Sequence, residues 1–221
     1  MKNSVKIAIG LVHYPTLDRE KKVVATNITN FDIHDIARAA RTYGVSQYYI
    51  IHPAREQLMF VERVQDHWRT GYGSKFNPSR SKALEPVRTM ESVEKAWEHW
   101  NESLKDDGFV ELEAKQKIFN EQTALRSFGL KMGQPRSLLV TTSARQIEGV
   151  PATTFKNLRE RILEDKTPCL LLFGTGYGMT PELIQGTDVL VEPIKGVLES
   201  GFNHLSVRSA VSICLDRLLG S

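Results

Sequence analysis

The sequence predicts an α/β fold with a mostly parallel sheet flanked by helices. Apolar runs of strand length alternate with segments of helical periodicity, and no internal repeat, low-complexity tract or long linker interrupts the alternation. The 221 residues are 41% hydrophobic and 25% charged, which is ordinary for a globular domain. We therefore expect residues 1–221 to form a single domain.

The apolar runs locate the strands. Ser4–Val12 contains Lys6, lacks a small-residue cleavage site and runs into Pro15, so it indicates a first strand and not a signal peptide. The other predicted strands are Ser46–His52, Leu84–Val87, Ser137–Thr142, Pro168–Phe173 and Thr187–Val191.

Helical spacing locates the helices. In Asp32–Tyr43 the apolar residues recur at helical intervals, Asn30 or Asp32 can cap the start, and Gly44 follows the end. A polar, helix-prone stretch, Glu111–Phe128, predicts a peripheral helical excursion that spans about residues 104–134. Further helices are predicted over Glu56–Arg69, Ser92–Ser103, Thr154–Glu164 and Leu205–Leu219.

The charge and the cysteine content limit the classes of protein to which this chain can belong. The 29 basic and 26 acidic residues permit a polyanionic partner without requiring one. Cys169 and Cys214 both lie in apolar patterns, which indicates buried thiols of a reducing cytoplasm and neither a disulfide nor a metal site. No run of 18 apolar residues occurs, so we expect no membrane span.

A glycine-rich turn, Gly174–Gly178, follows the apolar run that ends at Phe173. Backbone amides in such a turn can meet a ligand, although a tight turn without a ligand is the simpler interpretation. The spacing to Glu192 partly matches a nicotinamide dinucleotide fingerprint. That fingerprint needs a helix of several turns behind the glycines, whereas Pro181 and Gly186 bracket a single turn here.

Three more segments join the glycine turn in a specific order. Asn27–Val45 lies upstream, Glu192–Gly196 follows the run Thr187–Val191, and Gly201–Val211 opens the last helix. Together they resemble the motifs of the SPOUT superfamily of RNA methyltransferases, and the upstream segment is similar to the first motif of its SpoU branch. The resemblance covers nearly the whole chain.

The resemblance implies a C-terminal deep trefoil knot with S-adenosyl-L-methionine bent in the cleft between the knotted loops, held largely by main-chain groups. It also implies a homodimer through the knotted region, whose active site takes residues from both subunits, and no need for a metal. The expected cofactor contacts are Thr141, Phe173, Gly174, Gly176, Gly178, Ile194, Gly196 and Leu205.

The resemblance also implies methylation of RNA, with tRNA as the expected substrate and a ribose 2′-hydroxyl as the favoured acceptor. Arg38 matches the SpoU arginine that reaches the reacting ribose or its phosphate, although an ordinary surface arginine is the alternative interpretation. Either Asn203 or His204 matches the family's asparagine before the terminal helix and would orient the acceptor. The glutamate of the second SpoU motif is absent, which leaves the methylated atom open.

Two alternatives remain open. The first is methylation of tRNA at guanine N1, for which SPOUT members use an aspartate as proton acceptor; Asp32, Asp35 and Asp188 are the candidates. The second is a non-catalytic module that binds the cofactor or RNA.

The segment His67–Arg80 suggests contact with RNA. Basic side chains there alternate with aromatic residues and glycines on an expected loop, a composition suited to phosphate contacts and base stacking as well as to a solvated loop. The predicted RNA contacts are Asn30, Arg69, Lys75 and Arg80.

Overall fold

The chain forms a seven-stranded sheet in which every strand pair is parallel, in the order β5-β4-β1-β8-β6-β9-β7. The computed structural model describes residues 5–106, 137–145, 147, 150, 152–197 and 204–221. The strands are β1 (Ile7–Val12), β4 (Gln47–Ile51), β5 (Val87–Met90), β6 (Leu138–Thr142), β7 (Ala152–Thr153), β8 (Cys169–Gly174) and β9 (Val189–Val191). The predicted α/β class and the parallel sheet are confirmed.

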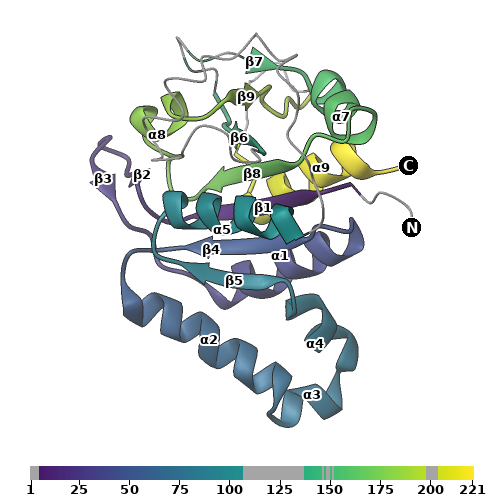
Figure 1. Cartoon of the computed structure of the whole chain (residues 1–221). Helices are drawn as coiled ribbons and strands as arrows, with labels where there is room; N and C mark the ends of the chain where they lie inside the picture. The colour runs from purple at the N-terminus through teal and green to yellow at the C-terminus, as the bar shows by residue number, and fades with distance from the viewer. Residues whose placement is uncertain (1–4, 107–136, 146, 148–149, 151, 198–203) are drawn as a thin grey trace.

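Helices cover both faces of the sheet, with α5 in front in Figure 1. One apolar cluster joins the sheet to α1, α2, α7 and α9, and a second joins its other face to α5 and α8. In β1, Ile9 faces the first cluster and Ala8 the second, so a strand buried on both sides must be apolar throughout. The helices are α1 (Asn30–Thr42), α2 (Arg55–Arg69), α5 (Val93–Asp106), α7 (Phe155–Leu163), α8 (Pro181–Gln185) and α9 (Val207–Leu219).

The order of the strands makes neighbouring loops part at the carboxyl edge of the sheet. Strand β8 lies between β1 and β6, yet the chain leaves β8 toward α8 on one face and leaves β1 and β6 toward α1 and α7 on the other. Loops that part in this way mark the position where open parallel α/β sheets bind ligands. We therefore expect a site among the residues that follow Val12 and Gly174.

A small antiparallel hairpin, β2 (Thr16–Leu17) and β3 (Val23–Val24), packs on the glycine turn after β8. Leu17 N donates to Gly178 O at 2.9 Å, and Tyr177 N donates to Leu17 O at 3.0 Å. The sequence did not predict this hairpin, because strands of two residues are too short to show a periodicity.

Helices α2, α3 (Tyr72–Phe76) and α4 (Pro78–Leu84) extend beyond the edge strand β5 and form an arm (Figure 1). The expectation of a loop over His67–Arg80 is wrong, because most of that segment is helical. Asn77 caps α4 by accepting from Arg80 N at 3.1 Å. A Cβ on Gly73 would lie 2.7 Å from the ring of Trp68, so this glycine permits close packing of α3 on α2 and does not mark a flexible loop.

The other differences between the predicted and the observed structure concern the ends of helices and strands. Thr29, and neither Asn30 nor Asp32, is the N-cap of α1; Asp32 completes a capping box with it. Gly44 follows the helix with φ +70°, as predicted. Strand β5 begins at Val87 because Leu84 belongs to α4. The predicted excursion lies outside the described residues, except for 104–106 at the end of α5.

Candidate functional site

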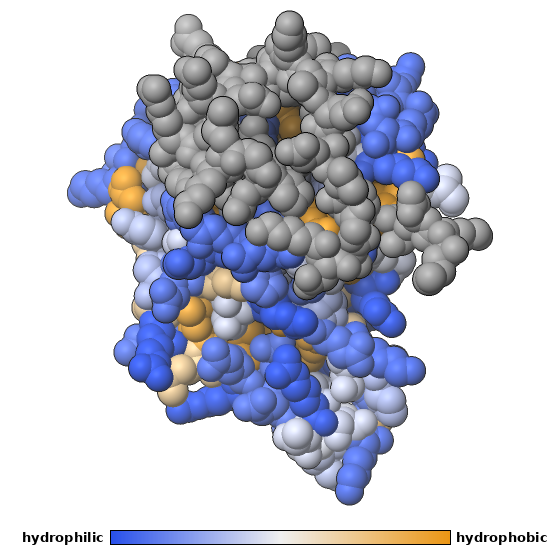
Figure 2. Space-filling view, in the orientation of Figure 1, coloured by the Kyte–Doolittle hydropathy of each residue, from blue (hydrophilic) through white to orange (hydrophobic). Residues whose placement is uncertain are grey.

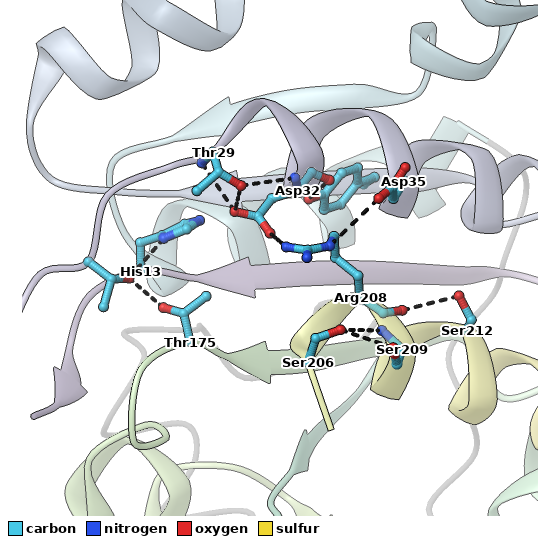
Figure 3. A network of polar contacts seen from close by, with 11 residues as sticks. His13, Thr29, Asp32, Asp35, Thr175, Ser206, Arg208, Ser209 and Ser212 are labelled. Atoms are coloured by element: carbon cyan, nitrogen blue, oxygen red, sulfur yellow. Dashed lines mark hydrogen bonds and ion pairs between the residues drawn. The ribbon is translucent and has the colours of Figure 1, made fainter. Parts of the chain in front are cut away.

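Polar side chains from distant parts of the chain meet at the carboxyl edge near β1 and β8 (Figure 3). His13 directly follows β1, and Thr175 directly follows β8. Asp32 and Asp35 lie on the first turns of α1, and Arg208 lies on the first turn of α9. The site therefore combines the two ends of the sequence.

Asp32 is the most constrained carboxylate of this group. Its Oδ2 accepts from Thr29 N at 3.1 Å, one of the two bonds of the capping box, and also from Thr29 Oγ1 at 2.6 Å. Its Oδ1 accepts from Nη1 of Arg208 at 3.2 Å, and only 6% of the side chain is exposed. The carboxylate thus fixes the start of α1 to the start of α9.

Arg208 connects both acidic residues of α1. Its Nε lies 3.6 Å from Oδ2 of Asp35, whose side chain is half-exposed, and its guanidinium lies 5.6 Å from the ring centre of Phe31. Asp188, the third acidic candidate, lies elsewhere: it precedes β9 and accepts from Leu139 N at 2.7 Å, a buried contact within the sheet. The structure therefore brings two of the three candidate aspartates to the carboxyl edge.

A chain of hydrogen bonds fixes the tautomer of His13. The hydroxyl of Thr175 donates to Val12 O at 3.0 Å, so its oxygen accepts from the hydroxyl of Thr26 at 2.5 Å. Because Thr26 has no second proton to give, its oxygen accepts from Nδ1–H of His13 at 2.9 Å. The Nε2 atom of His13 is then an unprotonated acceptor, and it is buried without a hydrogen-bond partner among the described residues.

Burial keeps His13 neutral at physiological pH. Desolvation lowers the pKa of His13 from 6.5 to about 4; nearby Asp32 opposes this lowering and His52 adds to it. The rings of His13 and His52 lie 6.1 Å apart, and burial lowers the pKa of His52 as well. Neither His13 nor Arg208 was predicted from the sequence to belong to the site, because their partners are remote in the sequence.

The lowered pKa of His13 predicts a loss of stability in mild acid. The unfolded chain takes up this proton near pH 6.5 and the folded chain only near pH 4, so the free energy of unfolding falls as pH drops through this interval. At the acidic end of this interval, the loss of unfolding free energy caused by His13 reaches about 3 kcal/mol. His13→Asn should therefore give a shallower fall in urea unfolding experiments between neutral pH and pH 4; an equally steep fall would contradict the assignment.

The expected cofactor residues outside the glycine turn differ in exposure. Thr141 and Phe173 are buried in the sheet, where the hydroxyl of Thr141 lies 3.2 Å from that of Thr187. Ile194 is partly buried against the core beside the carboxyl edge. Gly196 and Leu205 are exposed.

The glycine turn is more enclosed than the sequence suggested. The amides of Thr175, Tyr177 and Gly178 donate to Val12 O, Leu17 O and Thr175 O. Gly176 has φ +60°, and a Cβ there would lie 3.0 Å from Leu17 O. The conformation and the hairpin contact therefore explain this glycine without a ligand.

A matched pair of glycine variants separates packing from cofactor binding. Gly176→Ala should lower the free energy of unfolding by about 2 kcal/mol, because it meets both a positive φ and a close carbonyl oxygen. Gly196→Ala should change stability by less than about 0.5 kcal/mol, since its Cβ would meet nothing within 4 Å. If Gly196→Ala binds S-adenosylhomocysteine as tightly as the wild type in calorimetry, that loop does not approach the cofactor.

The residues predicted to contact RNA or acceptor come from α1, from the arm and from the segment before α9. Arg38 and Asn30 are exposed on α1, and His204 is exposed before α9. Arg69 and Lys75 are exposed on the arm, whereas Arg80 stacks on Trp68 with 5.1 Å between its guanidinium carbon and the ring centre. Asn203 lies outside the described residues.

The parallel sheet with helices on both faces makes the chain an open α/β protein. Proteins of this class bind ligands where neighbouring loops part at the carboxyl edge of the sheet. A family model described as SAM-dependent RNA methyltransferase matches residues 6–126 and 117–220. The chain therefore belongs to this family of S-adenosylmethionine-dependent RNA methyltransferases, and the expected cofactor and enzyme class are confirmed.

Two relatives carry the name tRNA (guanine-N(1)-)-methyltransferase. The one from Oleidesulfovibrio alaskensis is 37% identical and the one from Nitratidesulfovibrio vulgaris 33%, each over 96% of this chain and 41% of its own length. The chain thus spans about two fifths of these relatives. A protein of Aquifex aeolicus is 34% identical over 96% of this chain and 87% of its own length.

Solved structures of two methylase-type proteins share the fold of this chain. A methylase family protein from Neisseria gonorrhoeae has a TM-score of 0.58 at 13% identity, over 100% of this chain and 84% of that chain. TrmJ from Z. mobilis has a TM-score of 0.55 at 13% identity, over 99% and 70%. At this identity the likeness concerns the fold alone.

The described residues at the carboxyl edge fit the cofactor in chemical type. Gly196 is open on its Cβ side, Gly178 has φ +102° with no atom within 4 Å of a Cβ, and Val197 and Leu205 expose apolar surface. Main chain and apolar groups of this kind suit an adenosine and a methionine chain. That the glycine turn and the segments 192–197 and 204–206 hold the cofactor stays a prediction.

No helix among the described residues has the length and apolar character needed to cross a bilayer. Within the same residues, no three His, Cys, Asp or Glu side chains gather in a way that could hold a metal ion.

Proposed function

We propose that the chain methylates tRNA at N1 of a guanine base. The observation that carries this proposal is the pairing of Asp35 and Asp32 with Arg208 at the carboxyl edge, where a half-exposed carboxylate lies beside a guanidinium. The names of the two relatives support the same acceptor. This replaces the ribose 2′-hydroxyl as the favoured acceptor.

The chemistry requires a proton acceptor. When bound, S-adenosylmethionine supplies a methyl group that is already electrophilic, and the guanine N1 that forms a bond to this methyl must lose its proton. In the proposed mechanism the carboxylate of Asp35 receives that proton as the N–CH₃ bond forms and the S–CH₃ bond breaks. Arg208 orients Asp35, and Asp32 anchors Arg208.

Asp35 suits this role better than Asp32 does. The oxygens of Asp32 already accept from Thr29 and Arg208, and its side chain is almost fully buried, so a substrate proton cannot reach it without breaking the capping box. The side chain of Asp35 is 49% exposed and can meet a substrate. Asp32 therefore acts as a positioning residue in this mechanism.

Ribose 2′-O methylation is the second candidate, favoured by the position of Arg38. This arginine is exposed on α1, one helical turn after His34. An arginine in this position could meet a ribose or its phosphate. The relatives named for guanine N1 are more than twice as long as the match, which keeps this candidate open for the chain itself.

Nucleoside analysis distinguishes the two acceptors. Unmodified tRNA would be incubated with the chain and methyl-labelled S-adenosylmethionine, digested to nucleosides and examined by mass spectrometry. Label in 1-methylguanosine supports the proposal, and label in a 2′-O-methylnucleoside supports the second candidate. Binding of S-adenosylhomocysteine without transfer to any tRNA would indicate a non-catalytic module.

We further propose that the C-terminal part of the chain is knotted and that one domain, 1–221, pairs as a homodimer through it. Exposed apolar side chains at the carboxyl edge, Phe31, Val197 and Leu205, support a covering partner there. Light scattering measures the mass in solution. A cytoplasmic location stays a prediction from the cysteine pattern.

A further inference from the structure

Helix α3 displays two aromatic rings that the fold does not use. Tyr72 and Phe76 lie one helical turn apart, and they are 76% and 73% exposed. Their rings are nearly parallel, with centres 6.0 Å apart and 24° between the planes. Two large apolar rings in water at one place on a small helix indicate a contact surface.

The inner side of the arm holds this pair in place. Gly73, between the two aromatic residues in the sequence, packs against Trp68 and His67 so closely that no Cβ would fit. Arg80 stacks on the same Trp68, and buried Gln65 donates to Val87 O at 3.0 Å, which ties α2 to the sheet edge. A rigid backing of this kind displays the rings without a large entropic cost on binding.

The surroundings of the rings are positively charged. From His67 to Leu84 the sequence contains four basic residues and no acidic residue; the basic residues are Arg69, Lys75, Arg80 and Lys82. Helix α1 packs against α4 and carries the exposed basic residues Arg38 and Arg41. Basic residues therefore lie both on the segment with the rings and on the helix that carries Asp35.

We propose that Tyr72 and Phe76 form a stacking platform for unpaired bases of the RNA substrate, with Arg69 and Lys75 on the flanking phosphates. Aromatic rings stack on the flat face of any base, and single-stranded RNA is bound by rings interleaved with basic side chains. A loop of a tRNA offers such bases. The platform rests on the proposed RNA substrate but not on the atom that is methylated.

A protein partner fits this surface less well than RNA. On the face shown in Figure 2, the arm is mostly hydrophilic with small apolar patches, whereas stable protein interfaces have a continuous apolar centre. The excess of positive charge around the rings complements a polyanion. A second copy of this basic segment would repel it.

The test uses fluorescence anisotropy of a single-stranded RNA of about a dozen nucleotides, a length that matches typical site sizes. Tyr72→Ala with Phe76→Ala should weaken binding about tenfold to hundredfold, because stacking of a base contributes about one to two factors of ten. Tyr72→Leu with Phe76→Leu should weaken binding similarly, since leucine is apolar but cannot stack. The matched control is Met59→Ala with Phe60→Ala, two exposed apolar residues on α2 of the same arm, and should leave the affinity unchanged.

The binding and light-scattering results distinguish the stacking platform from the alternatives. If the leucine pair binds RNA like the wild type, or if the wild type binds no RNA, the platform is wrong. If the alanine pair alters the mass in light scattering, the rings belong to a protein interface. If the alanine pair weakens RNA binding but the wild type transfers no methyl to tRNA, the platform stands and the proposed function fails.

Discussion

Replacing Asp35 by asparagine is expected to slow methyl transfer by about a hundredfold or more, the contribution typical of a positioned proton acceptor. Asparagine keeps the size of the side chain but cannot accept the proton of guanine N1. The carboxylate is half-exposed and paired to Arg208 at 3.6 Å, so its loss should leave the fold intact. Single-turnover transfer of labelled methyl to tRNA measures the rate, and calorimetry with S-adenosylhomocysteine should show unchanged cofactor affinity.

Arg38→Ala serves as the counterpart in the same assay. If the acceptor is guanine N1, this variant should keep most of the wild-type rate, because Arg38 has no part in the proton transfer. If the acceptor is a ribose hydroxyl, the outcome reverses: Arg38→Ala loses about a hundredfold as a preorganised donor is removed, and Asp35→Asn stays active. Arg38→Lys would then rescue poorly, since an ammonium cannot replace the planar guanidinium.

Replacing Asp32 by alanine is expected to give the largest loss of stability, about 2 to 3 kcal/mol. The change removes the reciprocal half of the capping box and leaves Arg208 without its most buried partner. This loss is small for a broken buried ion pair, because the Arg208 side chain is 35% exposed and can still contact solvent and Asp35. Urea unfolding at neutral pH measures the free energy.

Two controls give this result its meaning. Asp35→Ala removes a more exposed ion pair of the same arginine and should cost less than about 1 kcal/mol. Asp32→Ala with Arg208→Ala completes a double-mutant cycle. The sum of the stability losses of the two single variants should exceed the stability loss of the double variant. Additive losses would mean that the two side chains do not interact in solution.

Local patterns sufficed for most elements but not for the contacts that join them. Helical spacing predicted α1 and glycine predicted its end, yet the cap is Thr29, because Asp32 reaches back to it. The glycines at 71 and 73 suggested a loop, whereas Gly73 serves the packing of α3 against Trp68. In each case a neighbour across space outweighed the local propensity.

In the candidate site, too, the sequence predicted continuous segments but not the contacts between remote residues. Motif spacing led to the glycine turn, the segment after β9 and the start of the last helix, since each is continuous in sequence. The pairing of Asp32 with Arg208 joins residues 176 positions apart. The hydrogen-bond chain from His13 to Thr175 likewise depends on strands β1 and β8 lying side by side.

The sequence by itself determined the α/β class, the family resemblance, the cofactor and the general position of the site, because periodicity and motif order are properties of continuous segments. Only the tertiary structure decided which acidic residues lie together at the carboxyl edge, which histidine is held neutral and why Gly176 must be glycine. Those outcomes depend on burial and on contacts between remote segments, and neither leaves a pattern in a single stretch of sequence.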